Sequence, residues 1–352
     1  MKILVISLAG IGDTLFATPL IHELRVNFPD AIIDVLVKEA GARDLLGNNP
    51  HVNRVFYKNL MTCGRLEALR FLWLLRRERY QLSINTHPQS RIHYRIAAWL
   101  AGAKTRISHE YECFTWLDRW LVNRTLPQDY ACHAVENNLA VLPLVGAEPK
   151  LSAHEPEIFL TAEEQKWAAD FLVVNGLAEK KWLGIHVGSG GTKNLALRRW
   201  PLKNYIELVQ RIRAAKPELP VLFLGGPEEK NDHEKIHQEM PNVLFPLTKN
   251  LRQVAALLKH GYGFLSVDTA LMHLAAAMQV PRQVVIETPT WNKPIEPYGN
   301  PFTLVKNPAV AGRNLDYYRY DGGGIKGTRE ELLACMASIQ VEDVFETVMK
   351  LI

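Results

Sequence analysis

The sequence predicts an α/β protein of two domains, each built on a parallel β-sheet covered by helices. Short apolar, β-branched runs alternate with helical patterns along most of the chain. Strands that are apolar throughout are typical of parallel sheets, because helices cover both faces of such sheets. The length of 352 residues is about twice that of a typical domain, and 47% of the residues are hydrophobic. The chain therefore has the length and the apolar content for two cores.

Five strands are expected in the first half of the chain. They are the apolar runs at residues 3–8, 31–37, 52–57, 82–85 and 105–108. The first connecting helix is indicated by residues that recur at helical spacing, namely Leu20, Ile21, Leu24 and Phe28. A polar, proline-containing segment from Gly146 to Pro156 then interrupts this alternation. Such a segment is typical of a linker, so we assign residues 1–155 to the first domain.

The alternation of strands and helices restarts after the linker and indicates a second Rossmann-like domain at residues 156–327. Its expected strands lie at residues 182–187, 221–224, 243–245, 263–267 and 283–286. Near the carboxyl end, Thr328 and Glu331 have the spacing of a capping box for a helix. We expect residues 328–352 to form a helical segment that packs back on the first domain.

Composition limits the class of protein. The four cysteines stand far apart without a C-x-x-C pair or histidines at ligand spacing, which indicates a reducing compartment and no metal site. No apolar run reaches the roughly 20 residues of a membrane span, and no cationic leader precedes the first strand, so a cytoplasmic protein is expected.

The net charge of +4 is concentrated locally, in Arg65, Arg70, Arg76, Arg77, Arg79, Arg91, Arg95, Lys104 and Arg106. Two interpretations remain open, an anionic partner or membrane surface and solvated helix faces. No nucleic-acid-binding signature is present.

The most informative stretch follows the strand expected at residues 263–267. Asp268 and Thr269 are residue types that cap helices, and an apolar helical pattern continues through Leu271, Leu274, Ala275 and Met278. A helix that begins there directs unpaired N–H groups and its positive dipole end toward the carboxyl edge of the sheet. The stretch is therefore either a phosphate site or an ordinary capped junction.

A glycine turn follows the first strand and carries an acidic residue. Gly10, Gly12 and Asp13 resemble the start of a dinucleotide fingerprint, but Leu15 replaces its third glycine. A nicotinamide dehydrogenase is therefore disfavoured, because that glycine permits close packing of helix on sheet. Asp13 is either a helix N-cap or a general base that reaches a substrate hydroxyl across the open turn.

Three further turns in the second domain suit a nucleotide. Residues 186–193 form a glycine loop that can bind an anion through Ser189, Gly190, Gly191 and Thr192, but the loop lacks the G-K-[ST] ending of a P-loop. Arg198 and Arg199 follow, and the pair suits a diphosphate or forms a solvated turn. In the turn at residues 224–229, a glutamate either accepts hydrogen bonds from ribose hydroxyls or places its negative charge at the positive end of a helix dipole.

The turn after the strand at residues 82–85 supplies the candidate acceptor surface. It runs from Thr86 through His87 to Arg91. His87 is either a ligand of the acceptor or simply a loop histidine.

Taken in order, these motifs resemble the glycosyltransferase family 9 heptosyltransferases, which extend the inner core of bacterial lipopolysaccharide. The matching stretches are Gly-Ile-Gly-Asp at 10–13, Arg-Trp-Pro at 199–201, Leu-Gly-Gly at 224–226, Asp-Thr-Ala-Leu-Met-His at 268–273, Pro-Tyr-Gly at 297–299 and Cys-Met at 335–336. The resemblance spans nearly the whole chain, and the run at 268–273 is its most specific part.

The resemblance implies a GT-B fold, in which two Rossmann-like domains present parallel sheets to a central cleft. It implies the transfer of heptose from an ADP-heptose-type donor with inversion at the anomeric carbon. The reaction is expected to need no metal and no cofactor, since the donor is a co-substrate. The acceptor is the anionic, lipid-linked core oligosaccharide, with peripheral contact at the cytoplasmic face of the inner membrane. By position in the motifs, Asp13 is the catalytic base. The implied donor contacts are Ser189, Gly190, Gly191, Thr192, Arg198, Glu229, Thr248, Lys249, Asp268, Thr269, Ala270 and His273, and the implied acceptor contacts are Gly12, His87 and Arg91.

Three positions depart from the family pattern. Ala270 replaces the usual glycine, Arg198 replaces a phosphate-binding lysine, and residues 287–291 replace a Gly-Pro-Thr turn. Two alternative functions are a GT-B nucleotide-sugar epimerase or hydrolase, which consumes donor without an acceptor, and a non-catalytic sugar-nucleotide binding protein. An intact Asp13 argues against the second.

Overall fold

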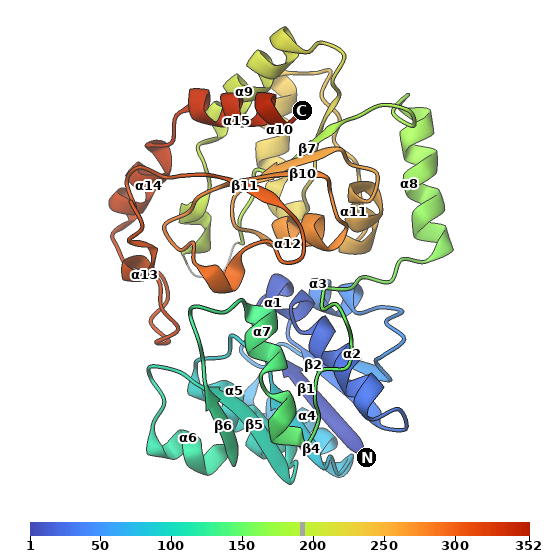
Figure 1. Cartoon of the computed structure of the whole chain (residues 1–352), viewed down its shortest axis with the longest axis vertical. Helices are drawn as coiled ribbons and strands as arrows, with labels where there is room; N and C mark the ends of the chain where they lie inside the picture. The colour runs from blue at the N-terminus through green and yellow to red at the C-terminus, as the bar shows by residue number, and fades with distance from the viewer. Residues whose placement is uncertain (191–193) are drawn as a thin grey trace. The chain divides into compact units, whose positions relative to one another are not determined.

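The computed structural model describes residues 1–190 and 194–352, and these residues form two compact units (Figure 1). The first unit contains Met1–Phe159 and Tyr320–Gly323, and the second contains Leu160–Arg319 and Gly324–Ile352. The chain therefore leaves the first unit four residues later than the linker pattern predicts.

The first unit is built on a six-stranded parallel sheet of order β3-β2-β1-β4-β5-β6. Its strands are β1 (Lys2–Ser7), β2 (Ile32–Val37), β3 (Arg54–Tyr57), β4 (Leu82–Asn85), β5 (Thr105–Glu110) and β6 (Arg124–Pro127). The five expected strands are confirmed. The sequence analysis missed β6, a four-residue edge strand that ends in a proline and has none of the apolar run of an interior strand.

The helices of the first unit lie on both faces of its sheet. They are α1 (Ile11–Leu15), α2 (Thr18–Asn27), α3 (Ala40–Leu45), α4 (Arg65–Arg77), α5 (Ile92–Ala101), α6 (Trp116–Leu121) and α7 (Ala134–Leu139), followed by the 3-10 turn η1 (Leu142–Val145). The strand order runs outward from β1 to β3 and then reverses at β4. Because parallel crossovers are right-handed, α1 to α3 cover one face and α4 to α6 the other. The reversal makes a switch point between β1 and β4.

The second unit is built on a five-stranded parallel sheet of order β11-β10-β9-β7-β8. Its strands are β7 (Leu183–Ile185), β8 (Val221–Phe223), β9 (Gly263–Ser266), β10 (Arg282–Ile286) and β11 (Phe302–Val305). The strand predicted at 243–245 is wrong, since Leu244 makes only an isolated bridge to Leu222. Pro246 follows at once and has no N–H for a ladder, so the pairing stops there. The sequence analysis missed β11.

Eight α-helices and three 3-10 turns are described in the second unit. They are α8 (Ala162–Val174), η2 (Leu195–Arg198), α9 (Leu202–Ala215), η3 (Pro227–Glu229), α10 (Lys230–Glu239), α11 (Leu251–Leu258), α12 (Ala270–Ala277), η4 (Lys293–Ile295), α13 (Asn314–Tyr317), α14 (Arg329–Ala337) and α15 (Val341–Leu351). Among the residues described, no helix has both the length and the apolar character needed to cross a membrane.

The last two helices pack in the second unit, so the expectation that residues 328–352 return to the first domain is wrong. Val341, Val344 and Val348 are buried in the core beneath α9, β10 and β11. Burial of this valine stripe holds α15 there. The late segment that joins the first unit is instead Tyr320–Gly323, where the Tyr320 N–H donates to the hydroxyl of Tyr130 at 2.6 Å.

Candidate active site

The candidate donor site lies at the carboxyl edge of the second sheet. From β7 the chain moves outward to β8 and later returns to place β9 on the other side of β7. The loops after β7 and β9 therefore diverge at a switch point, which is where open α/β sheets bind ligands. β10 lies next to β9, so the turns after β7, β9 and β10 share one edge (Figure 1).

The amino terminus of α12 is capped as the sequence predicts. Thr269 is the N-cap residue, and its hydroxyl accepts hydrogen bonds from the N–H groups of Leu271 at 3.1 Å and Met272 at 3.4 Å. Ala270 is the first helical residue and is partly exposed, whereas Asp268 and Thr269 are buried. The positive end of an eight-residue helix is thus presented at the switch point.

Arg198 connects the turns after β9 and β10. Its Nη1 donates to Oδ2 of Asp268 and, at 3.1 Å, to the hydroxyl of Thr290. Only 12% of the Arg198 side chain is exposed, which rules out the solvated turn for this residue. Its Nε is buried and has no hydrogen-bond partner within the described ranges. A guanidinium held on one side with a donor unused on another suits a phosphate oxygen.

Burial controls the protonation of the two titratable groups beside Arg198. Burial raises the pKa of Asp268, and the Arg198 charge opposes that shift. Burial, and then the Arg198 charge, lower the pKa of His273 to about 3, so its imidazole is neutral at neutral pH. His273 Nε2 lies 3.9 Å from Oδ1 of Asp268. The site therefore combines one cation, one carboxylate and a neutral ring.

Arg199 supports the glycine loop rather than facing solvent. Its Nη2 donates to the carbonyl oxygen of Ser189 at 3.1 Å and lies 3.4 Å from Oε1 of Glu229. Its Nη1 donates to Asp232 at 3.1 Å. The hydroxyl of Ser189 is buried and has no hydrogen-bond partner in the described part of the chain. Gly190 is exposed beside it, while Gly191 and Thr192, also predicted for this loop, lie outside the described residues.

Glu229 lies at the start of η3. Its Oε2 accepts the N–H of Gly226, the N-cap residue, at 2.9 Å, so the carboxylate lies at the positive end of this turn, as the helix-dipole interpretation expects. A Cβ at Gly188 would lie 2.2 Å from Oε1 of Glu229, which explains the glycine at that position. A contact of Glu229 with ribose stays a prediction. Thr248 and Lys249 precede α11, and the Lys249 N–H donates to Gln253 at 2.7 Å; their nucleotide contacts also stay predictions.

Asp13 lies beside the switch point of the first sheet, directly after β1. The predicted N-cap role is wrong, since Gly10 is the N-cap of α1 and Asp13 is the third helical residue. The Gly10 N–H donates to Oδ2 of Asp13 at 2.6 Å, and the side chain is partly exposed. Burial, and then the Asp13 charge, raise the pKa of Tyr94. The carboxylate is therefore oriented by its own turn, as a general base requires.

The other acceptor candidates of the first unit are largely buried. His87 has no exposed surface, and its ring stacks on Tyr111 with 5.7 Å between ring centroids. Burial lowers the pKa of His87 well below its usual value. Gly12 is buried inside α1, and Arg91 donates from Nε to the carbonyl oxygen of Gly322 at 3.2 Å. Acceptor contacts of these three residues stay predictions, although His87 offers no atom at the surface.

Thr290 was not predicted as a site residue, and the contacts of Arg199 with the glycine loop were not predicted either. Thr290 lies in the turn after β10, and its position at the carboxyl edge of a strand adjacent to β9 was the available signal. Arg199 was predicted only as one of a pair that suits a diphosphate or forms a solvated turn, but it contacts Asp232 and two predicted site residues, Ser189 and Glu229.

Two parallel α/β units, with a largely buried arginine side chain and a capped helix terminus at the switch point of the second, are the architecture of GT-B enzymes that act on nucleotide sugars. The family model described as glycosyltransferase family 9 (heptosyltransferase) matches residues 69–317, and the chain belongs to that family.

Three known proteins illustrate the similarity. Lipopolysaccharide heptosyltransferase 3 of Escherichia coli is 26% identical over 282 residues, which are 77% of this chain and 78% of the relative. The solved family 9 glycosyltransferase of Veillonella parvula has a TM-score of 0.76 at 19% identity, covering 99% of this chain and 96% of that one. E. coli ADP-heptose lps heptosyltransferase II has a TM-score of 0.70 at 20% identity, covering 100% and 98%. The predicted fold class is thus confirmed.

Proposed function

We propose that this glycosyltransferase moves a heptose from an ADP-heptose-type donor to the inner-core oligosaccharide of lipopolysaccharide, with inversion at the anomeric carbon. The observation that carries the proposal is the largely buried side chain of Arg198, held by Asp268 and Thr290 beside the amino terminus of α12. Family membership supplies the class of transfer, and the two E. coli relatives named above are heptosyltransferases.

In the proposed mechanism, Asp13 takes the proton of an acceptor hydroxyl as that oxygen attacks the anomeric carbon. The new C–O bond forms while the bond from the anomeric carbon to the diphosphate oxygen breaks, and the electron pair leaves with ADP. A single displacement of this kind inverts the anomeric configuration. The chain gains a proton on Asp13, and the released diphosphate carries the balancing negative charge.

The leaving diphosphate is stabilised by residues of the second unit. Arg198 supplies a charge-assisted donor, and the N–H groups at the start of α12 supply the positive end of the helix dipole. Ser189 offers its buried hydroxyl from the loop after β7. Asp268 accepts a hydrogen bond from a hydroxyl of the donor sugar. Arg198 partly neutralises the charge of this carboxylate, so a neutral hydroxyl is a suitable partner for it.

Transfer with defined substrates tests this function. ADP-heptose is incubated with the enzyme, with and without lipopolysaccharide lacking its outer heptoses, and ADP release and acceptor mass are followed. ADP release that requires the acceptor, with one heptose added, supports the proposal. Donor consumption without acceptor would favour the epimerase or hydrolase, and ADP binding without turnover would favour the binding protein. Parallel trials with UDP- and GDP-sugars identify the nucleotide.

The proposed partner surface is an anionic bilayer, contacted by one exposed apolar face of the first unit. We define this aromatic face by the exposed residues Leu66, Leu69, Trp73 and Leu74 of α4 and Trp116 and Trp120 of α6. Both helices lie on the same side of the sheet and pack against α5, where Trp99 lies 5.0 Å from the ring of Trp120. Trp116 is 80% exposed and Leu66 73%.

Charge favours a lipid surface as the occupant of the aromatic face. Arg65, Arg70, Arg77 and Arg119 border it and are exposed, and the Arg77 guanidinium lies 4.8 Å from the Trp73 ring centroid. Tryptophan and arginine around leucine side chains are typical of interfacial helices, and each basic residue near an anionic bilayer contributes about 1 kcal/mol. A lipid-linked acceptor is found at such a surface.

Vesicle co-sedimentation tests the aromatic face. We expect the enzyme to bind vesicles containing phosphatidylglycerol more tightly than vesicles of phosphatidylcholine alone. Trp73→Ser together with Trp116→Ser should abolish the binding, whereas Val174→Ser on the exposed side of α8 should not. Equal binding of both variants to anionic vesicles would reject the bilayer as the partner of this face.

A further inference from the structure

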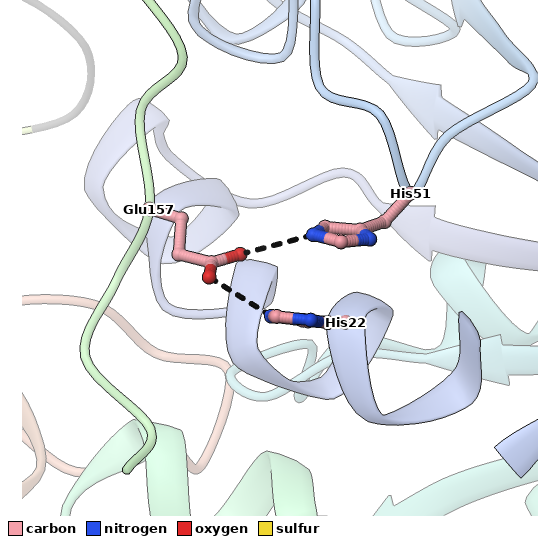
Figure 2. A group of neighbouring side chains, drawn as sticks. All are labelled: His22, His51 and Glu157. Carbon is pink, nitrogen blue, oxygen red and sulfur yellow. Dashed lines mark hydrogen bonds and ion pairs between the residues drawn. The ribbon is translucent and has the colours of Figure 1, made fainter. Parts of the chain in front are cut away.

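The first unit brings together two histidines and a glutamate that are far apart in the sequence. His22 lies on α2, His51 lies in the loop between α3 and β3, and Glu157 lies in the segment that leads out of the unit (Figure 2). One ligand atom of each residue lies within 4.8 Å of the other two. All three side chains are partly buried, with 15% of His51 and 28% of Glu157 exposed.

The Glu157 carboxylate lies beside the two rings and faces a nitrogen of each (Figure 2). His22 Nδ1 lies 2.9 Å from Oε1 of Glu157, and His51 Nε2 lies 3.8 Å from Oε2 (Figure 2). The rings are stacked, with 3.7 Å between their centroids. Oε2 of Glu157 is buried and has no hydrogen-bond partner among the residues described. A buried carboxylate oxygen without a donor is costly unless a cation or another donor satisfies it.

We propose that His22, His51 and Glu157 form a structural binding site for a divalent transition-metal cation of the Zn²⁺ type. Two imidazoles and one carboxylate are a set that such cations prefer, whereas Mg²⁺ and Ca²⁺ prefer oxygen ligands. With metal–ligand bonds of about 2.0–2.2 Å, tetrahedral ligand atoms lie about 3.4 Å apart. The measured separations of 2.9 and 3.8 Å bracket that value. Water would complete the coordination from the exposed side.

The position of Glu157 gives the cation a structural role. The segment before it is already attached to α2, because the buried Glu23 carboxylate accepts the N–H groups of Lys150 and Leu151 at 2.8 to 3.0 Å. The Glu157 N–H donates to the hydroxyl of Thr18 at 2.9 Å. A metal on Glu157 would add a coordinate bond between this segment, α2 and the loop at His51. The site contains none of the residues assigned to transfer, so it is independent of the proposed function.

Metal titration of the full chain tests the site. The protein is stripped with EDTA, dialysed and titrated calorimetrically with Zn²⁺ alone, and Co²⁺ absorption reports the coordination. We expect one Zn²⁺ per chain, a rise of about 5 °C or more in melting temperature near saturation, and slower amide exchange at residues 157–159. His51→Ala should weaken Zn²⁺ binding about tenfold or more.

Two variants separate loss of a ligand from loss of folding. Glu157→Gln keeps the size of the side chain and an acceptor for His22 but removes the anionic ligand, so it should fold and bind Zn²⁺ weakly. His260→Ala, an exposed histidine of the second unit, should bind as the wild type does. No 1:1 binding by the wild type at micromolar Zn²⁺ would overturn the proposal. So would unchanged binding by the folded Glu157→Gln and His51→Ala variants.

Discussion

Arg198 Nη1 donates hydrogen bonds to both the Asp268 carboxylate after β9 and the Thr290 hydroxyl after β10. The cation proposed to bind the donor is therefore fixed by two neighbouring strand ends before any ligand arrives. Such preorganisation reduces the entropy that is lost on binding. It also means that a diphosphate shares Arg198 with a carboxylate, so the strength of the contact depends on both partners.

Arg198→Ala should weaken ADP binding by about 1.5–3 kcal/mol, because a charge-assisted hydrogen bond in a largely buried site is lost. Calorimetric titration of ADP measures it. Arg211→Ala is the matched control, since Arg211 pairs with Glu342 on α15 and none of the residues assigned to the donor. Arg199 is unsuitable as a control because it holds the Ser189 loop.

Removal of Arg198 also leaves the buried Asp268 without its cation, so a folding defect has to be separated from a binding defect. Arg198→Lys retains the charge and should recover only part of the affinity, because lysine lacks a second donor in the position of Nε, which is left for a phosphate oxygen in Arg198. Equal ADP affinity in the wild type and a folded Arg198→Ala would remove Arg198 from the site.

Asp13→Asn should lower kcat by about 10²–10⁴ and leave ADP affinity nearly unchanged, because general-base catalysis typically contributes that much. Asparagine keeps an acceptor for the Gly10 N–H, so the turn should persist. Turnover and ADP affinity are measured in parallel. Wild-type turnover in this variant would leave Asp13 only the structural role of accepting the Gly10 N–H.

Transfer should survive EDTA, because helix termini and arginines, rather than a metal, offset the charge of the leaving diphosphate. Initial rates are measured at a temperature well below the melting point, so that the proposed Zn²⁺ site affects stability and not the assay. Activity that disappears in EDTA and returns with Mg²⁺ would contradict the proposed mechanism.

Stability should fall as the pH drops from about 6.5 toward 4. Burial lowers the pKa of His109 from its usual 6.5 to about 4. In this pH range His109 binds a proton in the unfolded chain but not in the folded chain, so acid favours unfolding. The contribution of His109 to the free energy of unfolding is therefore fully present above about pH 6.5 and is lost as the pH falls toward 4. The difference between the two pKa values of this histidine corresponds to about 3 kcal/mol in the free energy of unfolding.

The variant His109→Gln tests that pH dependence. Its side-chain amide can replace the hydrogen bond from His109 Nε2 to the Asn137 carbonyl oxygen, which is 2.8 Å long. The free energy of unfolding is measured in urea between pH 7.5 and 4.5. In His109→Gln its slope against pH should correspond to about one proton fewer than in the wild type, whereas His260→Gln, at an exposed position, should keep the wild-type slope. An unchanged slope in His109→Gln would mean that other groups dominate acid unfolding.

The sequence predicts regular features well where local chemistry decides them. Thr269 caps α12 because its hydroxyl reaches the two N–H groups that follow, and five strands of the first sheet are read from their own apolar runs. β6 was missed because its four residues, Arg-Thr-Leu-Pro, lack an apolar run, and β11 was missed although three of its four residues are apolar. Pairings between distant residues were not visible either: Arg198 with Asp268, or His22 with Glu157, depends on which strands and segments the topology makes neighbours.

The last prediction concerns Ala270, which stands where the family resemblance implies glycine. Ala270 begins α12 and so has helical, negative φ, which an L-residue adopts without strain. Ala270→Gly should therefore retain donor binding with a slightly lower stability. Ala270→Val adds two methyl groups at a helix start proposed to face the diphosphate, so it should weaken ADP binding by obstruction or by distorting the first turn. The dissociation constants of the two variants are compared after thermal melting confirms folding. An unchanged constant in a folded Ala270→Val protein would place the diphosphate elsewhere and remove the terminus of α12 from the donor site.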